Sequence, residues 1–312
     1  MKTLLLTAAL AALPQEPDPA PLKVFLLAGQ SNMEGQAVVD LDHEEHYNGG
    51  RGILTRVLED PELAPTFGHL RNPDGDWRVR DDVWVWYRAG SGERKIGPLS
   101  IGFAVYGGLH HFGPELMFGD VVGDEFDEPV LLVKACWGGK SLHVDFRPPG
   151  AGGETGPYYG RILEELSTAM ANLETDLPAL KGFRPELSGL VWFQGWNDMV
   201  NAEATAAYED NLVHLIGDLR KALDSPDLPV VVAETGNCNS EALRSAQAAA
   251  TRREEVGKRV RFVPTGDFLR APEDSPNTTH GHHWYGNAES YLRIGEAMGR
   301  AMVELLEDDS SR

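Results

Sequence analysis

The sequence predicts an α/β fold: a three-layer, doubly wound, mostly parallel sheet with helices on both faces. Two observations lead to this prediction. Short continuous apolar runs are typical of parallel strands that are buried on both faces, and segments with helical periodicity separate these runs along the chain. The predicted strands are residues 22–28, 129–135, 187–193, 228–234 and 260–264.

Helical periodicity is clearest in the second half of the chain. Tyr208, Leu212 and Leu219 share one face of a predicted helix, and residues 240–256 form a second helix that is rich in Ala and Arg. Asn287 precedes the last helix, and asparagine is a favoured residue at a helix N-cap. This alternation of strands and helices accounts for most of the chain.

The predicted organisation is a single domain, residues 21–307. Residues 36–127 do not follow the alternation, and we expect them to form a long insertion after the first strand that lies over the site. Residues 1–20 have a basic start, a short apolar run and a Pro-rich polar end, which is the layout of an export signal with a linker. The protein is therefore expected to be exported, periplasmic or secreted, and residues 308–312 to be a frayed tail.

Composition narrows the function classes. The chain has 312 residues with 48 acidic and 28 basic side chains, which gives a formal net charge of −20. Nucleic acid and anionic membranes attract cations, so we expect neither as a partner. No segment after the N-terminal run is long and apolar enough for a membrane helix. The two cysteines, Cys136 and Cys238, leave a single disulfide open.

Polar loops follow three of the predicted strands. Ser31 stands in "GQSN", Gly138 and Gly139 in "KACWGGKSL", and Gln194 and Asn197 in "WFQGWNDM". The carboxyl ends of parallel strands meet at one edge of a doubly wound sheet, where ligands bind. A serine attacks an ester when a base removes its proton and hydrogen-bond donors stabilise the oxyanion. Glycine backbone and side-chain amides can supply those donors.

These blocks resemble the SGNH hydrolase superfamily. More narrowly, "LLAGQSNMEG", "WGGKS", "QGWND", "FGPELMFG" and a late histidine resemble its sialate O-acetylesterase and acetylxylan esterase branch, carbohydrate esterase family 6. The resemblance implies the flavodoxin-like hydrolase fold and a carboxylic ester hydrolase that removes acetyl groups from sugars, with an acetylated carbohydrate as its substrate and no cofactor. It implies that Ser31 is the nucleophile. The implied oxyanion donors are Ser31, Gly138 or Gly139, and either Asn197 or Gln194.

The same resemblance implies a base in an Asp-x-x-His block before the last helix. His283 is the matching histidine, but His280 stands three residues before it in place of the aspartate. Asp274 and Asp267 are the nearest acids upstream. Either one completes a triad if the loop folds back, and otherwise Ser31 and His283 form a dyad without an acid.

Other residues are candidates for sugar contact or for a different function. Trp137, Trp196 and Trp284 adjoin the proposed catalytic residues, so they are candidate walls for a sugar ring, and Lys140 is a candidate substrate contact. The histidines of "HGHH" also suggest a metal cluster, yet their spacing matches no metal motif, and no metal is predicted. The alternative function is a carbohydrate-binding protein that has lost catalysis.

Overall fold

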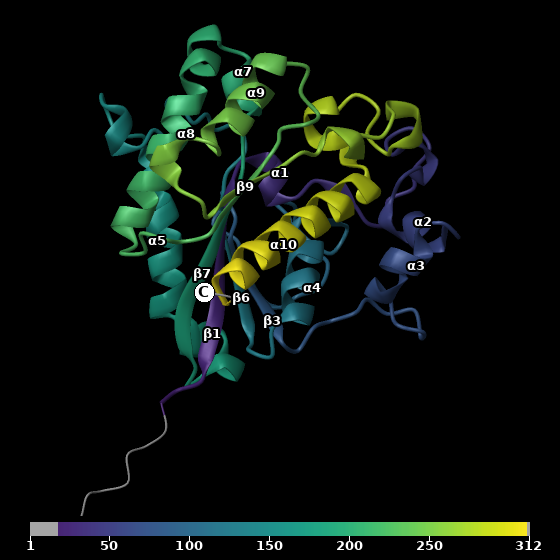
Figure 1. Ribbon diagram of the computed structural model, residues 1–312. Coiled ribbons are helices and arrows are strands. Elements are labelled where there is room, and N and C mark those ends of the chain that lie inside the picture. The colour runs from purple at the N-terminus through teal and green to yellow at the C-terminus, as the bar shows by residue number, and fades with distance from the viewer. Residues whose placement is uncertain (1–17, 311–312) are drawn as a thin grey trace, which may run out of the picture.

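The computed structural model describes residues 18–310, and side chains as far as residue 308. Most of the predicted export signal lies outside the described residues. Within the described part, seven strands form one twisted sheet in the order β4-β3-β6-β1-β7-β8-β9 (Figure 1). The strands are β1 (Pro21–Gly29), β3 (Val83–Arg88), β4 (Arg94–Pro98), β6 (Val130–Cys136), β7 (Arg184–Phe193), β8 (Val230–Ala233) and β9 (Val260–Val263). A separate small antiparallel pair joins β2 (Ala37–Val38) and β5 (His111–Phe112).

The predicted fold class is confirmed. All five predicted strands are present, each within a few residues of its expected bounds, and they pair in parallel. Strand β1 lies at the centre, and the chain passes from its β6 side to its β7 side. That reversal of direction makes the carboxyl end of β1 the topological switch point of the sheet.

Helices cover both faces of the sheet (Figure 1). The longer ones are α4 (Glu115–Glu125), α5 (Pro157–Ala171), α8 (Ala202–Ala222), α9 (Glu241–Ala250) and α10 (Ala288–Ser310). The shorter ones are α1 (Ser31–Glu34), α2 (Leu54–Glu59), α3 (Ala64–Phe67), α6 (Leu173–Asp176) and α7 (Trp196–Met199). No helix among the described residues is long and apolar enough to cross a membrane.

Helix boundaries follow the local sequence. The side chain of Asn287 accepts a hydrogen bond from the Ser290 N–H at 3.2 Å, so it caps α10 as predicted. Helix α9 ends at Ala250, earlier than predicted, and a separate 3₁₀ turn covers Glu254–Val256. The N-cap residue of α9 is Ser240, whose side chain accepts a hydrogen bond from the Leu243 N–H at 3.3 Å.

Each face of the sheet has its own core. Successive side chains of a strand point to opposite faces, so Phe25 and Leu27 pack with α4 and α10, whereas Val24 and Leu26 pack with α5 and α8. Cys136 and Cys238 lie in different cores as buried free thiols. No disulfide joins them.

The segment 36–127 differs in part from the predicted insertion. Strands β3 and β4 form a hairpin that extends the sheet, because β3 pairs in parallel with β6. Helix α4 packs against α10 on the sheet. Part of the segment therefore belongs to the central sheet and its helix layer, and Val105 and Tyr106 from its loops reach the carboxyl edge of the sheet.

Candidate active site

Three adjacent strands deliver the candidate residues to one place. Strand β1 lies between β6 and β7, and its last residue, Gly29, is in register with Cys136 and Phe193. The pairing continues for one more residue, since the Gln30 N–H donates to the Phe193 carbonyl and the Trp137 N–H donates to the Gly29 carbonyl. All three loops thus begin at the same level of the same edge.

The loop that carries Ser31 turns sharply at Gly29. A Cβ atom at this position would lie 2.2 Å from the Phe193 carbonyl oxygen, so only glycine fits. The chain then enters α1 with Ser31 as its first residue. The side chain of Gln36 donates to the Ser31 carbonyl at 3.2 Å, which holds the turn in place. Ser31 itself is 8% exposed.

Ser31 opens into a cavity of about 390 Å³. Most of the predicted residues share it: Ser31, Gly138, Gly139, Trp196, Asn197 and His283. The other lining residues are Gln30, Glu34, Gln36, Val105, Tyr106 and His282. A hollow of similar size lies beside the start of β9, and it is lined by Arg252, Lys258 and other residues that include no histidine. We therefore place the candidate site in the cavity of Ser31.

The turn Gly281–Gly286 carries His283 into this cavity. The side-chain amide of Asn32 donates to the His282 carbonyl at 3.1 Å, and its oxygen accepts from the Tyr291 hydroxyl at 2.7 Å. Trp284, which follows His283, adopts a left-handed φ of 53° with its side chain completely buried. Such a backbone is costly for a bulky residue, and burial of the indole ring offsets that cost.

His283 has no carboxylate partner among the described residues. Burial, and then the neighbouring His282 and His280, lower its pKa from the usual 6.5 to about 3. Asp274 lies in the exposed turn Pro272–Asp274 and faces a separate hollow with Arg270. The structure therefore does not bring Asp274 to His283. No hydrogen bond joins Ser31 and His283 either, and the two residues meet as walls of the cavity.

The two candidate oxyanion amides lie in different surroundings. Asn197 lines the cavity, where its NH₂ group donates one hydrogen bond, to the Gly139 carbonyl at 3.0 Å. Gln194 is 1% exposed and lies outside the cavity lining. Its amide donates to the Lys140 carbonyl at 3.0 Å and to the buried Asp198 at 2.6 Å. Asn197 thus has a free donor at the cavity, and Gln194 supports the loop from beneath.

The double glycine approaches Ser31 closely. A Cβ at Gly138 would lie 3.4 Å from the Ser31 Cβ and 3.0 Å from a carboxylate oxygen of Glu34. The Gly138 backbone also hydrogen-bonds the Glu34 carboxylate. Gly139 has a left-handed φ of 72°, and nothing lies within 4 Å of the position of its absent Cβ. Both glycines therefore leave backbone exposed beside Ser31.

Of the three candidate tryptophans, one lines the cavity of Ser31 and two are packed in the apolar cores. Trp196 is half-buried and lines the cavity. Trp137 is 3% exposed and packs against Phe146 and Tyr158, and Trp284 is completely buried in the core beneath α10. Trp137 and Trp284 are therefore not cavity walls. The position of a residue in a loop sequence does not indicate whether its side chain turns toward the ligand or the core.

Lys140 also lies outside the cavity lining. Its ammonium group is 3.6 Å from Asp145 and sits over the ring of Tyr158. This cation is thus engaged with its own loop, and not directed at the substrate position.

Sequence reasoning did not select three polar residues of the nucleophile block. Asn32 ties α1 to the His283 turn, Gln36 supports the Ser31 carbonyl, and Glu34 places a carboxyl in the cavity. A usable signal was present, because the mostly polar stretch "QSNMEGQ" comes directly after an apolar run. In the structure all of these residues are buried. Polar side chains in a buried turn are expected to hold hydrogen bonds.

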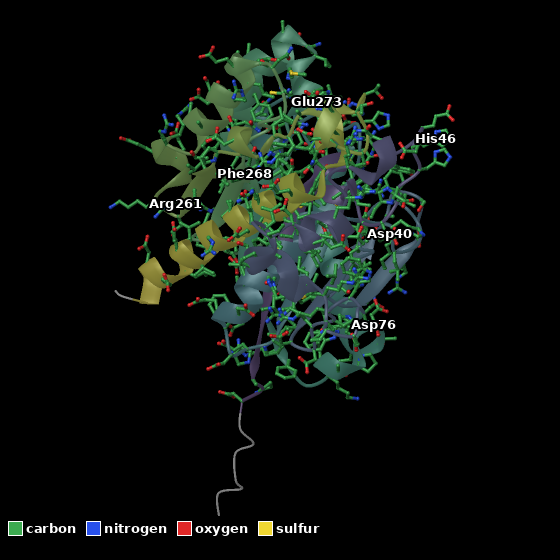
Figure 2. The ribbon with its side chains drawn as sticks, turned by 90° about the vertical axis from the view of Figure 1, so that its right-hand side faces the viewer. Asp40, His46, Asp76, Arg261, Phe268 and Glu273 are labelled. Carbon is green, nitrogen blue, oxygen red and sulfur yellow. The ribbon has the colours of Figure 1, made fainter. Side chains whose placement is uncertain are left out.

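The two histidine-rich stretches do not form a metal site within the described residues. No group of three or more His, Cys, Asp or Glu side chains in that part of the chain is arranged to hold an ion. The rings of His282 and His283 lie 4.1 Å apart in the site. The stretch "DLDHEEH" is an exposed loop, and Figure 2 shows His46 pointing away from the body of the protein.

Comparisons with known proteins identify a family for this chain. A family model described as "Carbohydrate esterase, sialic acid-specific acetylesterase" matches residues 21–304. A protein of Arabidopsis thaliana named "Probable carbohydrate esterase" is 27% identical over 295 residues, which cover 93% of both chains.

Two solved structures share the fold. The X-ray structure of an Arabidopsis thaliana protein aligns with a TM-score of 0.57 at 18% identity, covering 91% of this chain and 98% of that one. A carbohydrate acetylesterase from Xanthomonas citri aligns with a TM-score of 0.51 at 13% identity, covering 91% of this chain and 57% of that one.

Proposed function

Because the chain belongs to the sialic acid-specific acetylesterase family of carbohydrate esterases, we propose that it removes O-acetyl groups from carbohydrates as a serine esterase. The enzyme is of the sialate O-acetylesterase or acetylxylan esterase type. One observation carries the mechanism: Ser31 and His283, from opposite ends of the chain, line the same cavity as Asn197 and Gly139. The predicted export signal would put this reaction outside the cytoplasm.

In the proposed reaction His283 accepts the proton of the Ser31 hydroxyl as the serine oxygen bonds to the acetyl carbon. The oxyanion takes hydrogen bonds from the backbone of Ser31 and of Gly139, and from the Asn197 amide, because the Gly138 backbone is already hydrogen-bonded to the Glu34 carboxylate. His283 then returns the proton to the sugar oxygen as the ester bond breaks. Water attacks the acetyl-enzyme by the same route, releasing acetate and restoring Ser31.

We propose that Ser31 and His283 act as a dyad. No carboxylate pairs with His283 in the described chain, and burial holds its imidazole in the neutral form by lowering its pKa. The backbone of the turn is fixed instead, through Asn32 on His282 and through Tyr291, whose hydroxyl lies 3.5 Å from the His283 carbonyl. A fixed backbone orients the ring where other hydrolases use an acid.

The missing acid also favours a second candidate, a carbohydrate-binding protein on the same fold. Binding alone requires the cavity and Trp196 but not the Ser31 hydroxyl. Turnover therefore separates the two candidates.

The test is acetate release from 4-nitrophenyl acetate and from a panel of acetylated glycans. Ser31→Ala and His283→Ala should each lower kcat by about 10⁴-fold or more, since both act in one unit. His280→Ala is the matched control, because it removes a neighbouring exposed imidazole that does not line the cavity. If wild type releases no acetate but binds the glycans, the binding protein is the correct function.

A further inference from the structure

The cavity of Ser31 is lined by one acidic side chain, that of Glu34, and by no Lys or Arg among the described residues. Glu34 is 5% exposed and is three residues from the nucleophile. Its carboxylate accepts hydrogen bonds from the Tyr87 hydroxyl at 3.3 Å and from the Gly138 backbone. These donors hold the carboxyl beside the position of the reacting ester.

The cations near this cavity are committed elsewhere. Lys134 is completely buried, and its ammonium group donates to the Glu34 carbonyl at 3.0 Å, the Phe103 carbonyl at 2.6 Å and Glu115 at 2.7 Å. An ammonium group has three donors, so none is left for a ligand. Lys95 donates to the carbonyls of Gly102 and Tyr106.

The histidines do not supply positive charge. Burial lowers the pKa of His283 to about 3 and lowers that of His282 as well, so both rings are neutral near pH 7. Burial raises the pKa of Glu34 from 4.5, while Lys134, Tyr87 and Gly138 act in the opposite direction. Lys134 is in turn neutralised by Glu115, and the whole chain carries a charge of −20.

We propose that Glu34 makes this site selective for acetylated sugars without a carboxylate, and that anionic sugars are disfavoured within the cavity. This inference rests on the proposed esterase function and names its substrate class as neutral acetyl glycosides. A bound carboxylate would find no cation to pair with, would lose its hydration and would approach the like charge of Glu34. A sialic acid fits only with its carboxylate held outside the cavity.

The test compares two substrates that differ only in charge: the acetylated methyl glycoside of a uronic acid and the matching uronamide. Acetate release is measured at pH 8. We expect wild type to prefer the uronamide by at least about tenfold in kcat/KM, mainly through KM, because like charges repel in a poorly solvated site. Raising the salt concentration from about 0.02 to 0.5 M should increase kcat/KM for the uronate and leave that for the uronamide unchanged.

Glu34→Gln is the decisive variant, since glutamine keeps an oxygen for the Tyr87 hydroxyl. We expect Glu34→Gln to reduce the ratio of kcat/KM for the uronamide to kcat/KM for the uronate severalfold. Glu304→Gln is the control, because it removes the same charge from an exposed position near the end of α10 and should leave the preference unchanged. Equal use of both substrates by wild type, or an unchanged preference in Glu34→Gln, would overturn the inference.

Failure of the esterase function would look different. In that case wild type would release acetate from neither substrate, as Ser31→Ala does. Calorimetric binding of both compounds to Ser31→Ala then still tests the charge preference, with tighter binding of the uronamide expected. Equal affinities would reject the role of Glu34 whether or not the protein is an esterase.

Discussion

Burial sets the protonation state of His283, and this has a consequence for the pH profile. A pKa of about 3 lies below the usual 6.5, so the ring stays in its base form as pH falls. We expect kcat/KM for 4-nitrophenyl acetate to remain level from about pH 7 to 5 and to fall only below that range. An acid limb centred near pH 6.5 would contradict the prediction, and would mean that burial does not depress the pKa of His283 in the active enzyme.

The low pKa of His283 also makes the free energy of unfolding depend on pH. The unfolded chain binds a proton at His283 near pH 6.5, whereas the folded chain does so only near 3. The contribution of His283 to stability is therefore complete above pH 6.5 and is lost as pH falls from there toward 3. In urea unfolding, His283→Asn should flatten the acid side of the stability curve relative to wild type. Parallel curves for the two proteins would indicate that the folded and unfolded pKa values are equal.

We expect Asn197→Ala to lower catalytic activity and Gln194→Ala to lower stability. Asn197→Ala removes a donor at the cavity and should lower kcat by about 10²- to 10³-fold with little change in the unfolding midpoint. Gln194→Ala instead removes a partner of the buried Asp198, so it should lower the free energy of unfolding by about 1–3 kcal/mol. Steady-state kinetics and urea unfolding on both variants separate these roles. A larger loss of kcat in Gln194→Ala would reverse the assignment.

At the scale of elements, a buried ion pair joins strand β6 to helix α4 beneath helix α1. Lys134 and Glu115 are both 0% exposed and 2.7 Å apart. Lys134→Met leaves the Glu115 carboxylate without its cation and should cost about 3–5 kcal/mol in unfolding free energy. The double variant Lys134→Met/Glu115→Gln should recover much of this loss, because no uncompensated charge remains. If the double variant is as unstable as the single one, the energy resides in the other hydrogen bonds of Lys134.

The elements were predictable to different degrees for a physical reason. Strands β1 and β6 and the second half of β7 are buried on both faces, so their continuous apolar runs indicate the strands directly. Strand β3 has two half-buried positions and reads as part of an isolated hairpin. Its pairing with β6 connects residues that are far apart in the chain, and local periodicity carries no such information. The sequence therefore predicted the five strands from β6 to β9 in the sheet order and missed the edge that β3 and β4 form.

The residues of the candidate site were also predictable only where the local sequence determines their position. Ser31, Asn197 and His283 were predictable because the ends of parallel strands, and the turn before the last helix, place them together. The roles of Glu34 and Asn32 depend on contacts with Tyr87 and Tyr291, which come from other elements. Trp137 and Trp284 stand next to site residues in sequence, yet their side chains fill the two cores. Adjacency in sequence does not decide side-chain direction.

At the scale of the whole molecule, charge and fold oppose each other. Two apolar cores stabilise the folded chain, while the excess negative charges of a chain with net charge −20 repel one another. Several surface ion pairs, such as Arg253 with Glu209, offset the repulsion only locally. The charge remaining is long-range and is therefore sensitive to salt.

We expect added salt to stabilise this protein. Raising NaCl from about 0.02 to 0.5 M at pH 7.5 should increase Tm by about 2–5 °C, because screening weakens the self-repulsion of the folded state more than that of the expanded chain. The matched control is the same titration near pH 4.8, the sequence pI, where the net charge is close to zero and the shift should be much smaller. A Tm that falls with salt at pH 7.5 would mean that attractive ion pairs outweigh the net charge.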